Sequence, residues 1–398
     1  MRPEVAISAV VIGSVTAAVG VSTAVAAPDY PSWDDVEAAK QNEAAAAAKV
    51  DELNGLLSGL QATADAAGRA QQIAAEKYQL AKTALDEATA RESDLTDKAA
   101  AAGEQAKVSK MRAGLLAAHL ARAAGNDLSM NLALNGSESD DLLYQLGTMS
   151  KLSEQSQSIY DDALADQKLA ASLGSQAKIA TTQRAALASE AEAALADAQR
   201  TSDAAAAAVA EQQARQSQLF AQLASLKNTT AEAEAGYQAG LTAEKEQQSA
   251  PSVPPPPAAP PINDPGTVAP PVADKAATAI AFARAQIGDA YQFAGEGPDR
   301  WDCSGLTMKA YAAAGLSIGG HSATAQYNTA RNRGQLVPYS QAQPGDLIFY
   351  SEDGSDMYHV TIYTGGGRMV EAPYDGVPVR EVSVRSYERV AYVARPSA

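Results

Sequence analysis

The stretch Trp301-Asp302-Cys303-Ser304-Gly305-Leu306 contains the single cysteine in this chain of 398 residues. A polar turn precedes it, and apolar residues at helical spacing follow it, namely Leu306, Ala310, Ala313 and Ala314. This pattern predicts that Cys303 lies at the N-terminus of a helix. Free backbone N–H groups and the helix dipole stabilise a thiolate at such a position, so we expect a lowered pKa for the Cys303 thiol.

Further along the chain, an alternating segment predicts a strand that carries a histidine. Residues 358–363 alternate in polarity, which places His359 on the face opposite the core. Three glycines at 365–367 then turn the chain, and residues 368–373 return beside the first strand. If the pairing keeps this alternation, Glu371 lies on the same face as His359, and a slip of one residue would reverse it. A thiol, an imidazole and a carboxylate together would supply a nucleophile, a base and an orienting group.

Each of these residues also has a structural alternative. A single cysteine is commonly a buried apolar side chain, and Glu371 alone is a surface carboxylate. Asp302 alone is most simply the N-cap of the helix. A zinc site made of Cys303, His359 and Glu371 is disfavoured, because the sequence lacks a short-spaced ligand pair.

The two other histidines are weaker candidates for the base. His119 lies in an Ala-rich helical segment, where we expect a solvated side chain. His321 follows the turn Gly319-Gly320 and is expected to be a loop or packing residue, with a place in the substrate groove as the alternative. His359 is therefore the preferred base.

The segment from about residue 275 to 398 resembles the NlpC/P60 family of papain-like cysteine peptidases, which cut bacterial cell-wall peptides. Five motifs stand in the family's order: Tyr291-Gln292-Phe293-Ala294-Gly295, Asp302-Cys303-Ser304-Gly305-Leu306, Pro344-Gly345-Asp346-Leu347, His359-Val360-Thr361-Ile362-Tyr363 and Glu371-Ala372-Pro373. The resemblance implies an α+β papain-like fold for this part of the chain. One departure is Ala294-Gly295-Glu296-Gly297, where the family commonly has two adjacent glycines.

The resemblance also implies roles for individual residues. Cys303 would be the nucleophile, His359 the base, and Glu371 the third residue, a variant found in actinobacterial endopeptidases of the RipA and RipC type. Tyr291 would complete the oxyanion hole with the backbone N–H of Cys303. Further substrate-binding candidates are Asp302, Ser304, His321 and Ser322. The family implies no metal and no organic cofactor.

Residues 33–248 differ sharply from the C-terminal segment in composition. Two Ala-rich, proline-free arms, from about 33 to 124 and from about 148 to 248, each carry a narrow apolar stripe. Helices of this kind must pair, so we expect a long antiparallel coiled-coil hairpin. A small lobe at 125–147 is expected to cap the hairpin, and an exposed apolar knob that binds a partner is the alternative.

The remaining segments predict export and a linker. Residues 1–26 read as a signal peptide with cleavage after Ala26, although the long apolar run from Val5 to Val25 also suits an uncleaved anchor. In either case the rest of the chain would lie outside the cytoplasmic membrane. Residues 249–273 form a Pro-rich linker, with ten prolines between 251 and 271, and a catalytic domain is expected at 274–398.

The charge of the chain constrains its partners. The formal net charge is −16, and residues before 272 carry 34 acidic against 20 basic side chains. Such a segment does not favour nucleic acid as a partner. The resemblance extends to the order of domains in actinobacterial division endopeptidases. It implies peptidoglycan stem peptides as the substrate and an FtsEX-type membrane ABC complex as a partner of the coiled coil.

Three functions are consistent with this sequence. The first is hydrolysis of the D-glutamyl-diaminopimelate bond during cell separation, with the coiled coil restraining the active site. The second is an amidase or acyltransferase on the same fold. The third is a non-catalytic scaffold that binds the cell wall, which the complete set of Cys303, His359 and Glu371 disfavours.

Overall fold

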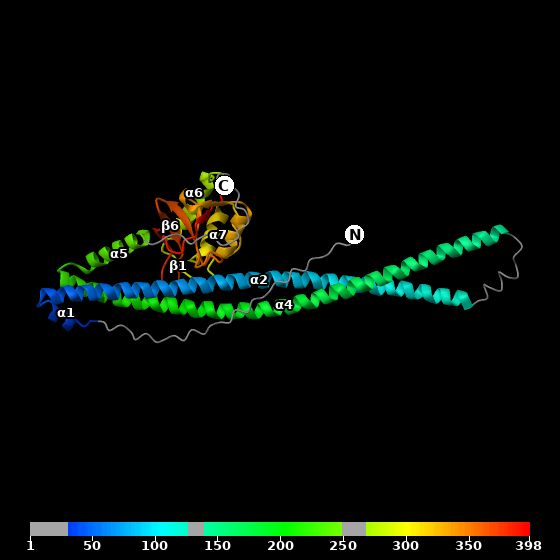
Figure 1. The fold of residues 1–398 in the computed structure, drawn as a ribbon, viewed down its shortest axis with the longest axis horizontal. Helices are drawn as coiled ribbons and strands as arrows, with labels where there is room; N and C mark the ends of the chain where they lie inside the picture. Colours follow the sequence, from blue (N-terminus) through cyan, green and yellow to red (C-terminus); the bar gives the residue numbers. More distant parts are fainter. Residues whose placement is uncertain (1–30, 126–138, 249–267) are drawn as a thin grey trace.

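A computed structural model describes residues 31–125, 139–248 and 268–398 (Figure 1). The expected signal peptide at 1–26 lies outside these residues, as do the tip of the expected lobe and nearly all of the Pro-rich linker. The described residues form a long pair of helices and a compact domain that lies against one side of the pair.

The helical part consists of α1 (Trp33–Ala39), α2 (Glu43–Gly125), α4 (Ser139–Lys227) and α5 (Ala231–Gln248). Helices α2 and α4 lie side by side and antiparallel. Gln105 of α2 hydrogen-bonds Asp166 of α4 at 3.3 Å, while nearer the other end Glu92 pairs with Arg184 at 3.6 Å. A small apolar core joins the helices at the end near α5, with buried side chains at Leu53, Leu57, Leu219, Phe220 and Leu223. The two arms are therefore paired, and their supercoil remains a prediction.

The arms are interrupted, which the sequence analysis did not foresee. The first arm breaks between α1 and α2, where the Asn42 side chain accepts hydrogen bonds from the backbone of Ala44 and Ala45. The second arm breaks between α4 and α5 at Asn228, whose φ of 54° is left-handed. Asparagine side chains compete for backbone hydrogen bonds and tolerate the left-handed conformation, so the prediction of continuous arms was wrong at these two residues.

The compact domain begins with α6 (Ala273–Ala285), β1 (Ala290–Tyr291), β2 (Arg300–Trp301), α7 (Cys303–Ala313) and α8 (Ala323–Asn332). It continues with β3 (Leu336–Pro338), the 3₁₀ helix η1 (Tyr339–Gln341), β4 (Leu347–Tyr350), β5 (His359–Gly365), β6 (Arg368–Glu371), β7 (Arg380–Ser383) and β8 (Tyr392–Ala394). Strands β3 to β8 form one antiparallel sheet in the order β3-β8-β4-β5-β6-β7.

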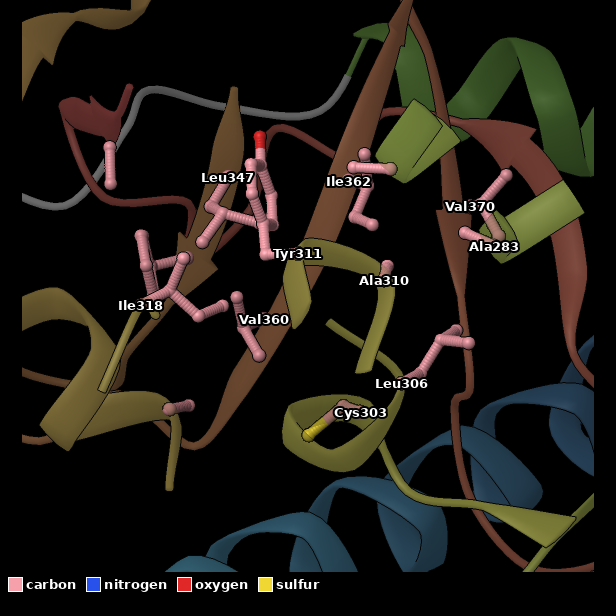
Figure 2. Close-up of a cluster of buried hydrophobic side chains, with 14 of the residues drawn as sticks. Ala283, Cys303, Leu306, Ala310, Tyr311, Ile318, Leu347, Val360, Ile362 and Val370 are labelled. Carbon is pink, nitrogen blue, oxygen red and sulfur yellow. The ribbon is translucent and has the colours of Figure 1, made fainter. Parts of the chain in front are cut away.

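The core of the domain lies between the sheet and helices α6 and α7 (Figure 2). Leu306 and Ala310 of α7 face Val360 and Ile362 of β5, as the predicted periodicities require, and Tyr311 lies beside them. Ala313, which the predicted stripe also contains, is exposed instead. All the fully buried members of this cluster come from residues 279–394. The domain therefore has its own core, separate from the small core that joins the helical pair.

Among the helices of the described residues, none combines the length and apolarity that a membrane crossing requires. The apolar run from Val5 to Val25 lies outside the residues that the structure describes.

Candidate active site

Cys303 is the first residue of α7, as the sequence predicts (Figure 2). The carboxylate of Asp302 caps this helix, accepting a hydrogen bond of 2.7 Å from the backbone N–H of Gly305 and one of 3.1 Å from the Ser304 hydroxyl. Asp302 is therefore an N-cap in this structure, and Ser304 is one of its donors. The Cys303 side chain is buried, with 8% of the residue exposed.

The expected lowering of the thiol pKa is contradicted in this arrangement. Burial raises the pKa of the Cys303 thiol well above its usual value, and the neighbouring Asp302 charge adds to the rise. Hydrogen bonds from the backbone of Val360 and Ser304 oppose the shift without reversing it. A helix N-terminus lowers a thiol pKa only where the thiolate keeps enough solvation, and this thiol is covered.

His359 and Glu371 form a buried pair. Strand β5 pairs with β6 so that Ile362 lies opposite Val370, and this register places Glu371 on the same face as His359. Nε2 of His359 lies 2.9 Å from the Glu371 carboxylate, and neither residue is exposed. Because a carboxylate only accepts hydrogen bonds, Nε2 carries a proton and Nδ1 is the nitrogen left to act as a base.

Two arginines also bind the carboxylate of Glu371. Arg385 donates to both of its oxygens at 2.8 and 3.0 Å, and Arg380 donates to one oxygen from two nitrogens at 2.9 and 3.0 Å. Burial alone would raise the pKa of Glu371, but the two guanidinium charges hold that pKa well below its usual range. Burial, assisted by the same cations, lowers the pKa of His359. These shifts favour a neutral thiol, a neutral imidazole and an ionised glutamate in the resting site.

The other predicted site residues lie near the start of α7. Tyr291 is buried, and burial together with the charge of Asp302 raises the pKa of its hydroxyl. His321 bridges Asp302 at 2.6 Å and Glu296 at 3.0 Å. Burial would lower the pKa of His321, but the two carboxylates raise it above its usual value. His321 is thus held in a network around the helix cap.

Helix α2 contacts the candidate base, His359. The side-chain amide of Gln72 lies 3.1 Å from Nδ1 of His359 and donates a 2.6 Å hydrogen bond to the carbonyl of Pro373. The Gln72 amide thus contacts Nδ1 of His359, the nitrogen that would act as the base. In the view of Figure 2, the end of α7 that carries Cys303 is the end nearest the blue helix α2.

One turn further along α2, Glu76 reaches the start of α8. Its carboxylate accepts hydrogen bonds from the Ser322 hydroxyl at 2.5 Å, from the Ala323 backbone at 2.9 Å and from the Thr324 backbone at 3.0 Å. Only 6% of Glu76 and 1% of Ser322 are exposed. Burial outweighs the hydrogen bonds and raises the pKa of Glu76.

The interface between the helical pair and the domain extends beyond these two residues. The ring of Tyr374, from the domain, packs against Gly68 of α2. The Tyr374 hydroxyl donates a 3.1 Å hydrogen bond to Asp65 of the same helix. Polar contacts flank this packing, with Arg69 paired to Glu388, and Gln71 and Ser202 hydrogen-bonded to Asp375. The rings of Tyr78 and Phe293 also meet, in a tilted arrangement with their centroids 5.3 Å apart. Helix α4 also contributes Val209, which packs with Ala64 and Tyr374. The contacts on α2 recur every three or four residues and so lie on one face of the helix.

Sequence reasoning missed Gln72, Glu76, Arg380 and Arg385. The two arginines follow Glu371 by 9 and 14 residues, and basic residues so close to a candidate site carboxylate were an available signal. Gln72 and Glu76 carried no such signal, because polar residues four apart on a helix are typical of a solvated face. In the part of the chain that the structure describes, no group of histidine, cysteine, aspartate and glutamate side chains is arranged to hold a metal ion.

Comparison with known proteins identifies relatives of the compact domain. Residues 288–395 match the profile of the NlpC/P60 family. Residues of this chain are 43% identical over 101 positions to the peptidoglycan endopeptidase RipA of Mycobacterium tuberculosis, a match that covers 25% of this chain and 20% of the relative. They are 40% identical over 102 positions to the probable endopeptidase p60 of Listeria grayi, covering 26% of this chain and 19% of the relative.

A solved structure of RipA, the resuscitation-promoting-factor-interacting protein, is 35% identical over 32% of this chain and 66% of its own, with a TM-score of 0.28. The chain thus matches about a fifth of the length of the curated relatives, and the matched part is the compact domain.

Proposed function

Because residues 288–395 form a domain of the NlpC/P60 family, we propose that this protein is a cysteine peptidase that hydrolyses peptide bonds in peptidoglycan. The observation that carries the proposal is the buried pair of His359 and Glu371 next to the start of α7. The backbone of Val360, the residue after His359, lies close enough to Cys303 to lower the pKa of its thiol, so β5 brings the segment that carries the proposed base to the proposed nucleophile.

The proposed mechanism uses the chain's own side chains. Nδ1 of His359 takes the proton of the Cys303 thiol, and the sulfur attacks the carbonyl carbon of the scissile bond. The oxyanion is stabilised by the Tyr291 hydroxyl and the Cys303 backbone N–H. The imidazolium then protonates the leaving amine, which leaves an acyl-enzyme thioester. Water attacks the thioester with His359 again as the base, and the thiol is restored.

Glu371 has a separate part in this cycle. It fixes the tautomer of His359 and stabilises the imidazolium that forms during each proton transfer. The two arginines keep Glu371 ionised, so the proton taken from the thiol stays on His359 and does not pass to the carboxylate. We propose Asp302, Ser304, His321 and Ser322 as the neighbourhood that receives the peptide.

We further propose that the substrate bond is the one between D-glutamate and diaminopimelate in stem peptides, and that the enzyme is exported and acts in cell separation. These points rest on the resemblance to RipA-type endopeptidases and on the signal-like sequence at 1–26. An FtsEX-type membrane complex that acts on the coiled-coil hairpin belongs to the same proposal.

We infer that the helical pair restrains the enzyme. Gln72 is bonded to the base nitrogen, Glu76 is bonded at the start of α8, and the thiol beneath has a raised pKa. A peptide cannot reach His359 while Gln72 holds that position. Activity therefore requires α2 to move away from the domain.

The test is digestion of diaminopimelate-type peptidoglycan by the chain from residue 28, with fragments identified by mass spectrometry. We expect products cut after D-glutamate from the Gln72→Ala variant, and none from the Gln72→Ala, Cys303→Ala double variant, although its circular dichroism spectrum is unchanged. Cleavage by the double variant would refute the thiol mechanism. Products cut at another bond would refute the assigned specificity, and transfer of the acyl group to an added amine would favour an acyltransferase.

A further inference from the structure

The carboxylate of Glu76 lies in a cradle made only of hydrogen-bond donors. The Ser322 hydroxyl already accepts a 3.0 Å hydrogen bond from the backbone of Ala325, so its proton is directed to Glu76. The backbone N–H groups of Ala323 and Thr324 are among those that the first turn of α8 leaves without intrahelical partners. Three converging donors at a helix N-terminus are suited to an anion.

The occupant of this cradle comes from a different part of the chain. Glu76 is separated from Ser322 by 246 residues, and it is one of the most buried acidic side chains of the helical pair. An acidic residue on a long solvated helix is ordinarily exposed, as Glu87 is on the same helix. Burial of Glu76 is therefore explained by the cradle and not by packing within the helical pair.

The cradle lies close to the base His359, and this position indicates which ligand the cradle binds when α2 has moved away. Gln72 and Glu76 are one helical turn apart, so their side chains start about 5 to 6 Å from each other. Gln72 contacts the base nitrogen and Glu76 fills the cradle. The cradle is thus at short range from the place where the scissile carbonyl must lie.

In a glutamyl residue linked through its γ-carboxyl, the distance between the free carboxylate and the scissile carbonyl matches the separation of Glu76 and Gln72. Its α-carboxylate stays free and is separated from the γ-carbonyl carbon by four carbon–carbon bonds, a span of about 5 Å when extended at about 1.5 Å per bond. An ordinary α-linked peptide has no carboxylate at this distance from its scissile carbonyl unless a side chain supplies one.

We propose that Ser322, Ala323 and Thr324 bind the free α-carboxylate of a γ-linked glutamyl residue, and that Glu76 is an internal substitute for that carboxylate. Helix α2 then inhibits as a competitor for the substrate site, with Glu76 in place of the substrate anion and Gln72 on the base. This inference deepens the proposed function and rests on it for the identity of the substrate.

Binding measurements with an inactive enzyme test the proposal. In the Cys303→Ala background, titration calorimetry compares the dipeptide L-alanyl-γ-D-glutamate with its α-carboxamide, L-alanyl-D-isoglutamine. Glu76→Ala leaves the three donors buried without partners in the docked state, so undocking is favoured and the cradle becomes available. We expect this variant to bind the acid at least tenfold more tightly than the Cys303→Ala parent does. The amide should bind the same variant at least fivefold more weakly than the acid.

A matched control is Glu87→Ala, which removes the same charge from an exposed position of α2 and should leave both affinities unchanged. If Glu76→Ala raised the affinity for the acid and for the amide equally, the proposal would be overturned. Helix α2 would then block the site sterically, and Glu76 would not act as a carboxylate substitute. No gain for either peptide would also overturn it. Because the assay needs no turnover, its outcome is independent of whether the wild-type chain hydrolyses peptidoglycan.

Discussion

At the scale of single residues, the unusual feature of the site is a glutamate held by two arginines and a histidine. A cysteine-peptidase histidine needs a partner that orients it but does not take its proton. The arginines meet this need, since they hold the pKa of Glu371 well below its usual range. They also lower the pKa of His359, which limits the pH range over which the imidazolium persists.

The pH dependence of hydrolysis should therefore respond to Arg380, the more exposed of the two arginines. Removing this cation with Arg380→Gln is expected to raise the pKa of His359, because a positive charge nearby disfavours the imidazolium. Because His359 must be neutral to take the thiol proton, its pKa sets the acidic limb of the profile of kcat/KM against pH, and this limb should move to higher pH by up to about one unit. The measurement uses the Glu76→Ala background, so that docking of α2 does not contribute.

Arg284→Gln is the control for this prediction, because Arg284 pairs with Glu381 at the surface and does not contact Glu371. A limb that stays in place, or moves to lower pH, in Arg380→Gln would show that the arginine charge does not act on His359.

The residues that the sequence could predict are those with a local pattern. Cys303 was identified by the helix that follows it, and the pairing of His359 with Glu371 by strand alternation. The thiol pKa was predicted with the wrong sign, because local pattern shows a helix N-terminus but not what covers it. Gln72 and Glu76 act across more than 240 residues of chain, and nothing in their immediate sequence distinguishes them from solvated polar residues.

At the scale of elements, docking of α2 depends on a glycine. The Tyr374 ring packs so closely on Gly68 that a Cβ atom there would lie 2.4 to 2.5 Å from three ring carbons. The helix itself has no need for glycine at this position, since glycine in a helix interior costs about 0.5–1 kcal/mol relative to alanine. The glycine is thus explained by the approach of the domain and not by the helix.

Substitution of Gly68 by alanine should therefore have two opposite effects. We expect the helical pair to become more stable to heat, because alanine favours the helix. Hydrolysis of muropeptides by the full chain should nevertheless increase several-fold, because the new methyl group displaces Tyr374 and loosens the docked helix. Chromatographic rates of product release and thermal unfolding followed by circular dichroism measure the two effects.

Gly59→Ala provides the comparison on the same helix, since a Cβ atom at residue 59 meets nothing within 4 Å. It should reproduce the gain in thermal stability without any gain in hydrolysis. If Gly68→Ala and Gly59→Ala gave the same rate, the contact with Tyr374 would have no part in the restraint.

At the scale of the whole molecule, the reactivity of the single cysteine, Cys303, measures whether the helical pair is docked on the domain. In the full chain the Cys303 thiol is buried and its pKa is raised, so alkylation by iodoacetamide at pH 8 should be slow. The domain at residues 268–398 has its own core, and we expect its thiol to gain solvent when α2 is removed. We expect it to be alkylated at least tenfold faster, and to hydrolyse peptidoglycan faster than the full chain.

Mass spectrometry counts the alkylated thiol directly, because no other cysteine interferes. Fully denatured full chain is the control for intrinsic reactivity. Equal alkylation rates in the native full chain and the separate domain would be inconsistent with a restraint by the helical pair.

The length of the helical pair has a mechanical consequence. The domain docks on α2 between Asp65 and Tyr78, whereas the helix continues to Gly125, which is roughly 70 Å beyond the docking region at 1.5 Å per residue. A stiff rod of this length is a lever whose pivot lies near the active site. A weak sideways force at the far end becomes a large torque at the docked face, so a pull applied far from the catalytic residues can uncover them without any contact near Cys303.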